Sequence, residues 1–276
     1  MLVVMAICIF PFLHVFSRSV SNSDAVMSGK VLLLPVGFDL INYKVTVMHS
    51  GFFTAYKNTI IYTAVGTAIT LFVTALCAYP LSKTRVFGRK IFMMLFIVTM
   101  FFNGGLIPNF ILINKLGLSD KIWAIVLPGA FNQFFIILAM SFMQGIPVEL
   151  EESAAVDGLN PIKTLIQIIL PLSKPVFATI ALFSAVGIWN DWFTPMIYLS
   201  SNDKYPIMLL LRNIITGGDV TSANALTTTS IGPGVNLNEA SLKSAAIILV
   251  VLPIITIYPF VQKYFVKGAM IGSLKG

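Results

Sequence analysis

Six long apolar stretches dominate this chain of 276 residues, and they constrain its fold more than any other feature. A helix needs about 20 mostly apolar residues to cross the hydrocarbon core of a bilayer. Hydrophobic residues make up 57% of the chain and charged residues only 11%, which is far from the balance of a soluble domain. The stretches that approach or reach the required length are residues 2–16, 52–81, 91–113, 122–143, 176–199 and 242–264.

Each stretch is too long for a strand of a membrane barrel, which has about ten residues of alternating polarity. The sequence therefore predicts an all-α membrane protein with six transmembrane helices, which form a single domain over residues 1–276. The first stretch is the shortest and lacks the basic flank of a signal peptide. We interpret it as a first transmembrane helix, and whether its start is complete stays open. Cys8 and Cys77 both lie inside apolar stretches, so no disulfide framework is expected.

The short loop over residues 83–90 sets the predicted orientation in the membrane. It carries Lys83, Arg85, Arg89 and Lys90, and such basic loops are typical of the cytoplasmic side. Six crossings then place both termini and residues 145–174 on that side as well. The net charge of +7 follows from this topology, and no clustered basic face with aromatic residues points to nucleic acid as a partner.

Residues 145–174 form a polar, acidic segment between two apolar stretches. Pro147 suits the first turn of a short helix, and the glutamates that follow favour the positive end of its dipole. Gly158 suits a left-handed stop after Asp157, and Asn160-Pro161 can cap and start a second helix. One apolar stripe of that second helix would contain Ile162, Leu165, Ile166 and Ile169. The pattern predicts a helix–turn–helix elbow at the cytoplasmic surface, with the stripe resting on the bundle.

The same segment resembles the EAA signature of ABC importer permeases, in which E-A-A is followed by G and then by I-x-L-P at fixed spacings. The matching residues are Glu152, Ala154, Gly158, Ile168, Leu170 and Pro171. Ser153 stands where the pattern has its first Ala, which replaces one small residue by another. The resemblance implies that the elbow couples the permease to an ATPase through Glu152, Ser153, Ala154, Asp157, Gly158 and Pro171. The alternative interpretation is a membrane-surface loop that links two spans and whose acidic residues are merely solvated.

Further strings along the chain are similar to permeases of carbohydrate ABC importers and to the maltose-type second permease subunit. They are Asn58-Thr59, Gly66-Thr67, residues 78–82, 102–108, 116–118, 170–175 and 189–193, and the tail strings 267–268 and 272–276. This group includes importers of neutral oligosaccharides and of oligo-uronates such as alginate or pectin fragments.

The resemblance implies a multi-pass permease subunit in a bacterial plasma (inner) membrane, which is a transport component and not an enzyme. It also implies a homologous second permease subunit, two cytoplasmic ATPase subunits and an extracytoplasmic binding protein that delivers an oligosaccharide. ATP and Mg would be bound by the ATPase subunits, so no cofactor is expected in this chain. Whether the sugar is neutral or acidic stays open.

Polar residues inside the apolar stretches are candidates for the substrate path, because such groups face the bundle interior or a water-filled cavity. They are Asn103, Asn132, Gln133, Trp189, Asn190, Asp191 and Trp192. The alternatives are a kink at Asn103, hydrogen bonds between helices at Asn132-Gln133, and an aromatic belt at the membrane interface. The outer segment 200–241 is rich in Gly, Ser, Thr and Asn. It either reaches the binding protein, as the resemblance implies, or is a flexible lid.

Other functions fit the sequence less well. Glu151-Glu152 partly matches the E-E-x-x-x-R motif of membrane metalloproteases, but Val156 occupies the position of the arginine. His14 and His49 are the only histidines, too few for a histidine-rich metal site, so no metal is expected. A secondary transporter would show an internal repeat and an acidic residue at the membrane centre, and the sequence contains neither. An ATPase would show a phosphate-binding loop, which the sequence also lacks. An ABC permease for a solute other than sugar is the main alternative, and an intramembrane protease is a distant one.

Overall fold

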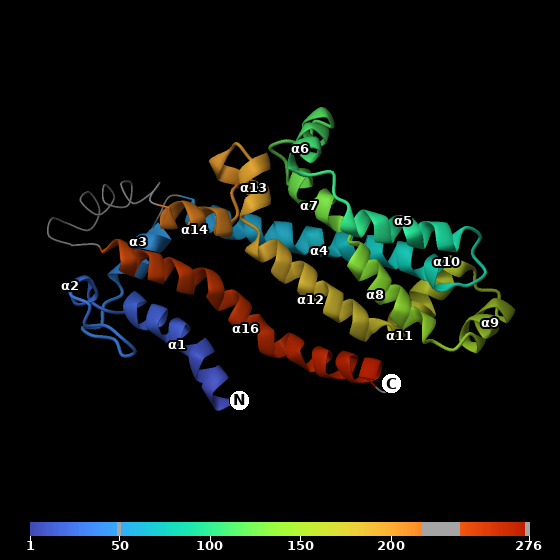
Figure 1. Ribbon diagram of the computed structural model, residues 1–276, viewed down its shortest axis with the longest axis horizontal. Helices are drawn as coiled ribbons and strands as arrows, with labels where there is room; N and C mark the ends of the chain where they lie inside the picture. Colours follow the sequence, from blue (N-terminus) through green and yellow to red (C-terminus); the bar gives the residue numbers. More distant parts are fainter. Residues whose placement is uncertain (49–50, 217–237, 274–276) are drawn as a thin grey trace. The chain divides into compact units, whose positions relative to one another are not determined.

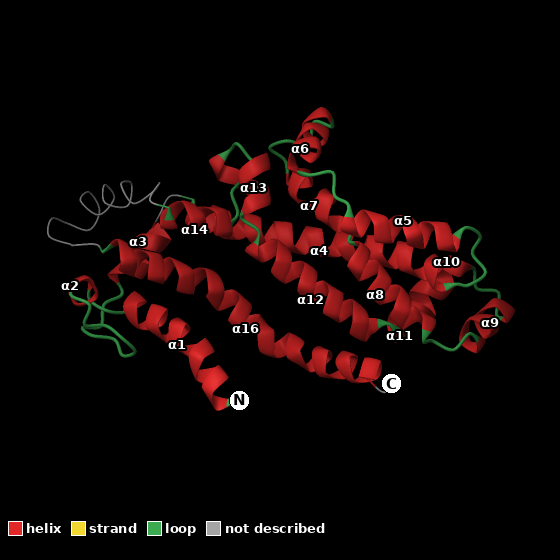
Figure 2. Ribbon diagram, in the orientation of Figure 1, coloured by secondary structure: helices red, strands yellow, loops and turns green. Residues whose placement is uncertain are grey.

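The computed structural model describes residues 1–48, 51–216 and 238–273, and their side chains apart from Leu2 and residues 257–273. The described residues are mostly helical and contain no strand, as Figure 2 shows. Ser21 and Phe38 form one isolated antiparallel bridge. The predicted all-α class is therefore confirmed.

The chain divides into two compact units. The first comprises Met1–Thr59, Asp191–Met196 and Ser200–Ile257, and the second comprises Ile60–Asn190, Ile197–Leu199 and Tyr258–Gly276. Two long helices, α4 (Phe52–Ser82) and α16 (Glu239–Ser273), both labelled in Figure 1, contribute residues to both units.

The first unit is held together by contacts between short helices and the beginnings of α4 and α16. Its further elements are α1 (Leu2–Ser19), α2 (Ser23–Met27), α3 (Ile41–Met48), the start of α13 (Phe193–Tyr198), a 3-10 helix (Asn202–Lys204) and α14 (Ile207–Ile215). The end of α1 is joined to α3 by a hydrogen bond of 2.7 Å between the hydroxyls of Ser19 and Tyr43. The Tyr56 hydroxyl of α4 donates to the backbone carbonyl of Leu249 in α16.

The second unit has a core in which α8 packs against both α5 and α12. Its elements are α5 (Arg89–Phe101), α6 (Leu106–Lys115), α7 (Ile122–Ala130), α8 (Gln133–Gln144), α9 (Glu149–Val156), α10 (Pro161–Thr164), a π-helix (Leu165–Ile169), α11 (Leu170–Leu172) and α12 (Lys174–Asn190). Ile136, Ala139 and Met143 of α8 lie in this core with Ile169 and Ile180. The core therefore fixes the helices that flank the acidic segment 145–174.

The prediction of six transmembrane helices is confirmed only in its coarser form. Two helices, Phe52–Ser82 and Glu239–Thr256, are long and apolar enough to cross a bilayer, and up to 5 crossings result if each bent helix pair counts as one. The bent pairs are α5 with α6 at 111°, α7 with α8 at 46°, and Pro161–Leu172 with α12 at 82°. The first apolar stretch forms a shorter apolar helix, Val3–Ser19. By length and composition, the described helices fit a membrane protein.

Two of the predicted spans are not single straight helices. The stretch 91–113 consists of α5 and α6, with 13 and 10 residues, so at about 1.5 Å per residue neither reaches across a bilayer core. The chain turns at Gly105, whose φ of +87° suits only glycine. The stretch 176–199 is likewise interrupted, because α12 ends at Asn190 and α13 begins at Phe193.

Large apolar side chains are exposed on several of these helices. Helix α5 has no buried residue, and on α1 the side chains of Ile7, Phe10 and Leu13 are exposed. Exposed apolar surface of this extent is expected where helices face lipid or another membrane subunit.

Candidate functional site

Helix α9 and the turn that follows it form the centre of the candidate site. Glu149, Glu151 and Glu152 occupy the first turn of the helix, where carboxylates interact favourably with the positive end of its dipole. The helix ends at Val156 with Asp157 as its C-cap, and Gly158 follows with a φ of +79°. The Leu159 N–H donates to the Ala154 carbonyl at 2.9 Å, which is the wide hydrogen bond of a glycine stop. Gly158 therefore forms the left-handed stop that the sequence predicts.

The next helix begins with the predicted cap. The Asn160 side chain accepts a hydrogen bond of 2.8 Å from the Lys163 N–H, and Pro161 occupies the first turn. The helix then widens into a π-helix just before Pro171. Proline has no N–H to donate and its ring would collide with the carbonyl one turn earlier, so a wider turn accommodates it. Pro171 itself is exposed, and α12 follows at the 82° bend.

The apolar stripe predicted for this second helix is only half correct. Leu165 and Ile169 are buried against the core, but Ile162 and Ile166 are 68% and 58% exposed. Adjacent residues on a helix diverge by about 100°, so the side of Leu165 meets the core while the side of Ile166 does not. Two large apolar side chains are thus left at the surface beside the acidic segment.

One face of α9 contacts the second unit's core region. Ala154 is buried, and Glu151 forms an ion pair with Lys83, the residue that follows α4. The Lys83 ammonium also lies 4.8 Å from the centroid of the Tyr79 ring. Sequence reasoning missed Glu151, although the extra glutamate beside the motif and the basic loop after α4 could have indicated the pair.

The other face of α9 is exposed. It presents Glu152, Ser153, Asp157 and Val156, and the Val156 side chain is 88% exposed. The Ser153 hydroxyl donates to the carbonyl of Glu149 at 2.8 Å within the same helix. Of the predicted coupling residues, Ala154 is therefore the one that is buried, and the others lie at the surface.

Two of the predicted substrate-path residues cap helices at breaks in the apolar stretches, and a third lies in the loop of such a break. Asn132 accepts from the Phe135 N–H at 3.2 Å, and Asp191 accepts through one carboxylate oxygen from two N–H groups at the start of α13, both at 3.0 Å. The first N–H groups of a helix have no partner within it, so these two side chains satisfy them. Asn103 accepts from the N–H of Gly105, the residue before α6, at 3.0 Å. Whether the same residues meet a substrate stays a prediction.

The remaining path candidates have different surroundings. The Gln133 amide donates to the Thr99 hydroxyl of α5 at 3.4 Å, and the Asn190 amide donates to the Val186 carbonyl at 2.9 Å. Trp189 is buried at the end of α12, whereas Trp192 is 38% exposed. Trp189 and Asn190 belong to the second unit, and Asp191 and Trp192 belong to the first. The predicted Trp-Asn-Asp-Trp cluster is therefore divided between the two units.

Asn58 and Thr59, which belong to a sequence string typical of carbohydrate importer permeases, attach helix α14 to α4. The buried Thr59 hydroxyl accepts from the Ile207 N–H at 2.7 Å and donates to the Ala55 carbonyl at 2.8 Å. The Asn58 amide donates to the carbonyls of Asp203 at 2.7 Å and Tyr205 at 3.2 Å. Three of these bonds hold the segment that leads into α14 against the start of α4, and the bond to Ala55, within α4, orients the Thr59 hydroxyl.

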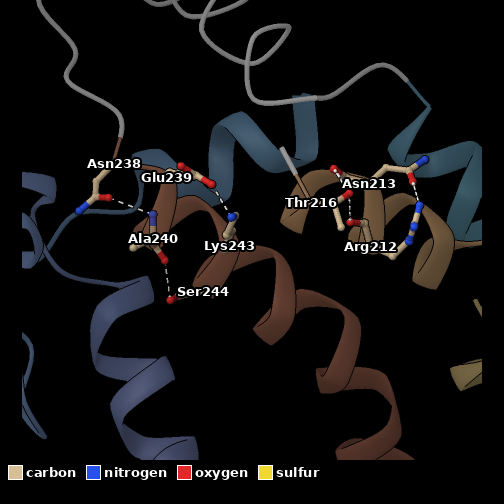
Figure 3. A network of polar contacts seen from close by, with 8 residues as sticks. All are labelled: Arg212, Asn213, Thr216, Asn238, Glu239, Ala240, Lys243 and Ser244. Carbon is tan, nitrogen blue, oxygen red and sulfur yellow. Dashed lines mark hydrogen bonds and ion pairs between the residues drawn. The ribbon is translucent and has the colours of Figure 1, made fainter. Parts of the chain in front are cut away.

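Figure 3 shows the polar contacts at the end of α14 and the start of α16. Asn238 caps α16 by accepting from the Ala240 N–H at 2.9 Å, and Glu239 forms an ion pair with Lys243 one turn later. Arg212 lies near the end of α14, and its guanidinium is 5.3 Å from the centroid of the Trp192 ring.

Some predictions concern residues outside the described ranges. In the outer segment 200–241 these are residues 217–237, which contain Gly217-Gly218 and residues 232–234. In the tail they are residues 274–276 and the side chains of residues 257–273. The predicted contact of the outer segment with a binding protein is therefore untested.

Comparison with known proteins identifies the class of this membrane protein. Residues 51–270 match the family described as "Binding-protein-dependent transport system inner membrane component", and the chain belongs to this family. It is 40% identical over 270 residues to the polygalacturonan/rhamnogalacturonan transport system permease protein YtcP of Bacillus subtilis (strain 168), covering 98% of this chain and 93% of that protein. It is 42% identical over 271 residues to protein LplC of the same organism, covering 98% and 90%.

A solved structure agrees with this classification. The fold is similar to a chain in the crystal structure of a bacterial ABC transporter involved in the import of the acidic polysaccharide alginate. The TM-score is 0.88 and the identity 36%, over 95% of this chain and 92% of that chain. The chain is thus a permease subunit of an ABC importer, which is a transport component and not an enzyme.

Proposed function

We propose that this permease translocates acidic oligosaccharides, of the oligo-uronate class, which an extracytoplasmic binding protein delivers. The observation that carries this proposal is the agreement between two relatives that resemble nearly the whole chain. YtcP is named for polygalacturonan and rhamnogalacturonan, and the structural relative is described as an importer of the acidic polysaccharide alginate. Polygalacturonan, rhamnogalacturonan and alginate all contain sugar units with carboxylates.

The proposed assembly contains this chain, a homologous second permease subunit and two cytoplasmic ATPase subunits that bind ATP and Mg. The chain would cross a bacterial inner membrane six times as one transmembrane domain. The five candidate spans and the shorter apolar helix Val3–Ser19 support that number. Cysteines at Gly88 and Asn160, in a variant without Cys8 and Cys77, should react with impermeant thiol reagents only from the cytoplasm. Reaction from outside would reverse the topology.

The exposed face of α9 is the proposed contact with an ATPase subunit. Glu152 and Asp157 offer negative charge there, and Val156 offers an apolar side chain that is 88% exposed. Gly158 leaves room for a close approach, because a β-carbon at this position would meet no heavy atom within 4 Å. An exposed acidic and apolar surface on one short helix fits a partner with a basic rim and an apolar pocket.

The experiment uses the complete complex in liposomes, with its binding protein and a panel of oligogalacturonates, oligomannuronates and neutral oligosaccharides. Uronates should stimulate ATP hydrolysis more strongly than the neutral sugars. Stimulation by neutral sugars alone would contradict the proposed substrate class.

The coupling role is tested in the same complex. Glu152→Gln should reduce stimulated hydrolysis by about tenfold if one charge-assisted contact of roughly 1.5–3 kcal/mol is lost. Asp24→Asn, which changes an exposed carboxylate in the first turn of α2, is the matched control and should behave like the wild type. Equal rates in Glu152→Gln and the wild type, with the assembly intact, would show that Glu152 does not contact the ATPase.

A further inference from the structure

Arg212 is the one ionisable residue of α14, a helix that buries most of its apolar side chains. Its side chain is partly buried, and its guanidinium lies over the Trp192 ring at 5.3 Å from the centroid. Among the described residues no carboxylate forms an ion pair with it. Its one side-chain hydrogen bond runs from Nη1 to the Asn213 amide oxygen at 3.4 Å, which is long for a bond of this type (Figure 3).

As far as the described residues are concerned, most of the guanidinium's N–H donors are available to a ligand. Arginine carries five N–H donors in a planar fork that matches a carboxylate, and an aromatic face below it fixes the orientation of that fork. A partly buried charge without an opposite charge is unfavourable, and a bound anion would offset that cost. The geometry therefore favours an acidic ligand at Arg212.

The neighbouring residues are compatible with such a ligand. Trp192 keeps 38% of its surface exposed, so part of the ring is accessible to the apolar face of a sugar. Phe193 packs edge-on against the ring with centroids 5.6 Å apart, which limits its rotation. Asp191, the acidic residue next to Trp192 in the chain, directs one carboxylate oxygen at the N–H groups of Phe193 and Thr194. The helix start thereby stabilises its negative charge.

We propose that Arg212, oriented by Trp192, binds the carboxylate of an acidic sugar unit and gives the permease its preference for charged over neutral oligosaccharides. Trp192 would contribute contact with the sugar ring. This inference rests on the proposed function and goes beyond it, because it assigns part of the specificity to the permease and not only to the binding protein.

The test compares two substrates in the reconstituted complex: an oligogalacturonate and its carboxyl-reduced, neutral counterpart of the same length. The measured quantity is the ratio of kcat/KM for stimulated ATP hydrolysis with the charged and the neutral sugar. Because the same binding protein serves every variant, its own preference cancels when a variant's ratio is divided by that of the wild type.

Arg212→Gln should lower this ratio about tenfold, as expected for one lost charge-assisted contact. Arg212→Lys keeps the charge but loses the fork, so a decrease of a few-fold is expected. Arg18→Gln is the matched control, because Arg18 is another partly buried arginine of the first unit, at the end of α1. It should leave the ratio unchanged.

An equal loss of rate with both sugars in Arg212→Gln would mean that Arg212 only braces α14 against Trp192, which overturns the inference. If Arg212→Gln does not assemble, Arg212→Lys decides, and an unchanged ratio in that variant overturns the inference as well. A wild-type complex that accepts only the neutral sugar refutes the proposed substrate class, and the inference with it. A wild type that prefers the uronate, with variants that keep this preference, refutes the inference alone.

Discussion

The ion pair between Lys83 and Glu151 should be a main attachment of α9 to the rest of the second unit. The Lys83 side chain is 25% exposed and the Glu151 side chain 14%, so the pair is neither fully solvated nor fully buried. Two unit charges 4 Å apart attract by about 4 kcal/mol at an effective dielectric constant of 20. The loss of hydration of the two charges offsets part of this attraction. Measured exposed ion pairs contribute roughly 0.2–1 kcal/mol to stability, whereas removing one partner of a buried pair costs roughly 3–5 kcal/mol. We expect a coupling energy of about 1–2 kcal/mol between these two intermediate limits.

The measurement is a double-mutant cycle with Glu151→Gln and Lys83→Met, followed by reversible unfolding in mixed micelles. Each single variant should lose about 1–2 kcal/mol, and the double variant should lose clearly less than the sum. The Lys83 ammonium also contacts the Tyr79 ring, so Lys83→Met should be the more costly single change.

A matched cycle with the exposed Glu149 on the same helix controls for the general effect of removing a carboxylate. Glu149→Gln and Lys83→Met should be additive within about 0.3–0.5 kcal/mol. Additivity in the Glu151 cycle as well would refute the idea that this pair holds α9. If α9 transmits ATPase movements, Glu151→Gln should also lower the ratio of stimulated to basal ATP hydrolysis.

Two packing predictions can be checked by the same unfolding measurements. A β-carbon on Gly66, in the interior of α4, would lie 2.6 Å from Cδ1 of Ile188, the end of a flexible side chain. The crowding opposes the gain of about 1 kcal/mol that alanine brings to a helix interior, so Gly66→Ala should be close to neutral, and it should be clearly more favourable in an Ile188→Val background, which lacks that atom. Equal effects of Gly66→Ala with and without Ile188→Val would contradict the close contact. Thr59→Val leaves the Ile207 N–H without its acceptor and should cost about 1–3 kcal/mol, whereas Thr59→Ser should stay near the wild type. A loss in Thr59→Ser as large as in Thr59→Val would show that the hydroxyl is not the reason.

The sequence was sufficient for features that depend on neighbouring residues. The apolar stretches predicted an all-α membrane protein, and one interpretation of Asn103 was a kink, at the place where α5 ends and α6 begins. Gly158 and Asn160 predicted a stop and a cap, because a left-handed conformation and an N-cap hydrogen bond each involve only a few consecutive residues. These signals do not depend on how distant helices pack.

The sequence was not sufficient where a distant contact decides a residue's role. The motif pointed to Glu152, but its neighbour Glu151 faces Lys83, which lies 68 positions earlier in the chain. The family string Asn58-Thr59 gave no hint that both side chains hold the segment before α14. Ile162 and Ile166 fit the same helical periodicity as the buried Leu165 and Ile169, yet the core covers only one side of the helix that begins at Pro161.

Polar residues at the helix breaks in the apolar stretches have a structural role of their own. A break inside an apolar stretch exposes backbone N–H groups in a medium with little water. Leaving such a group without a hydrogen bond there costs roughly several kcal/mol of free energy. Asn132 and Asp191 each precede a helix start and satisfy such groups. A polar residue at a break therefore has a structural reason to be there before any substrate is considered. Arg212 and Glu152 cap no helix. Their charges suit the helix dipole, in the last turn of α14 and the first turn of α9, but this interaction leaves their charged groups able to bind a sugar and an ATPase.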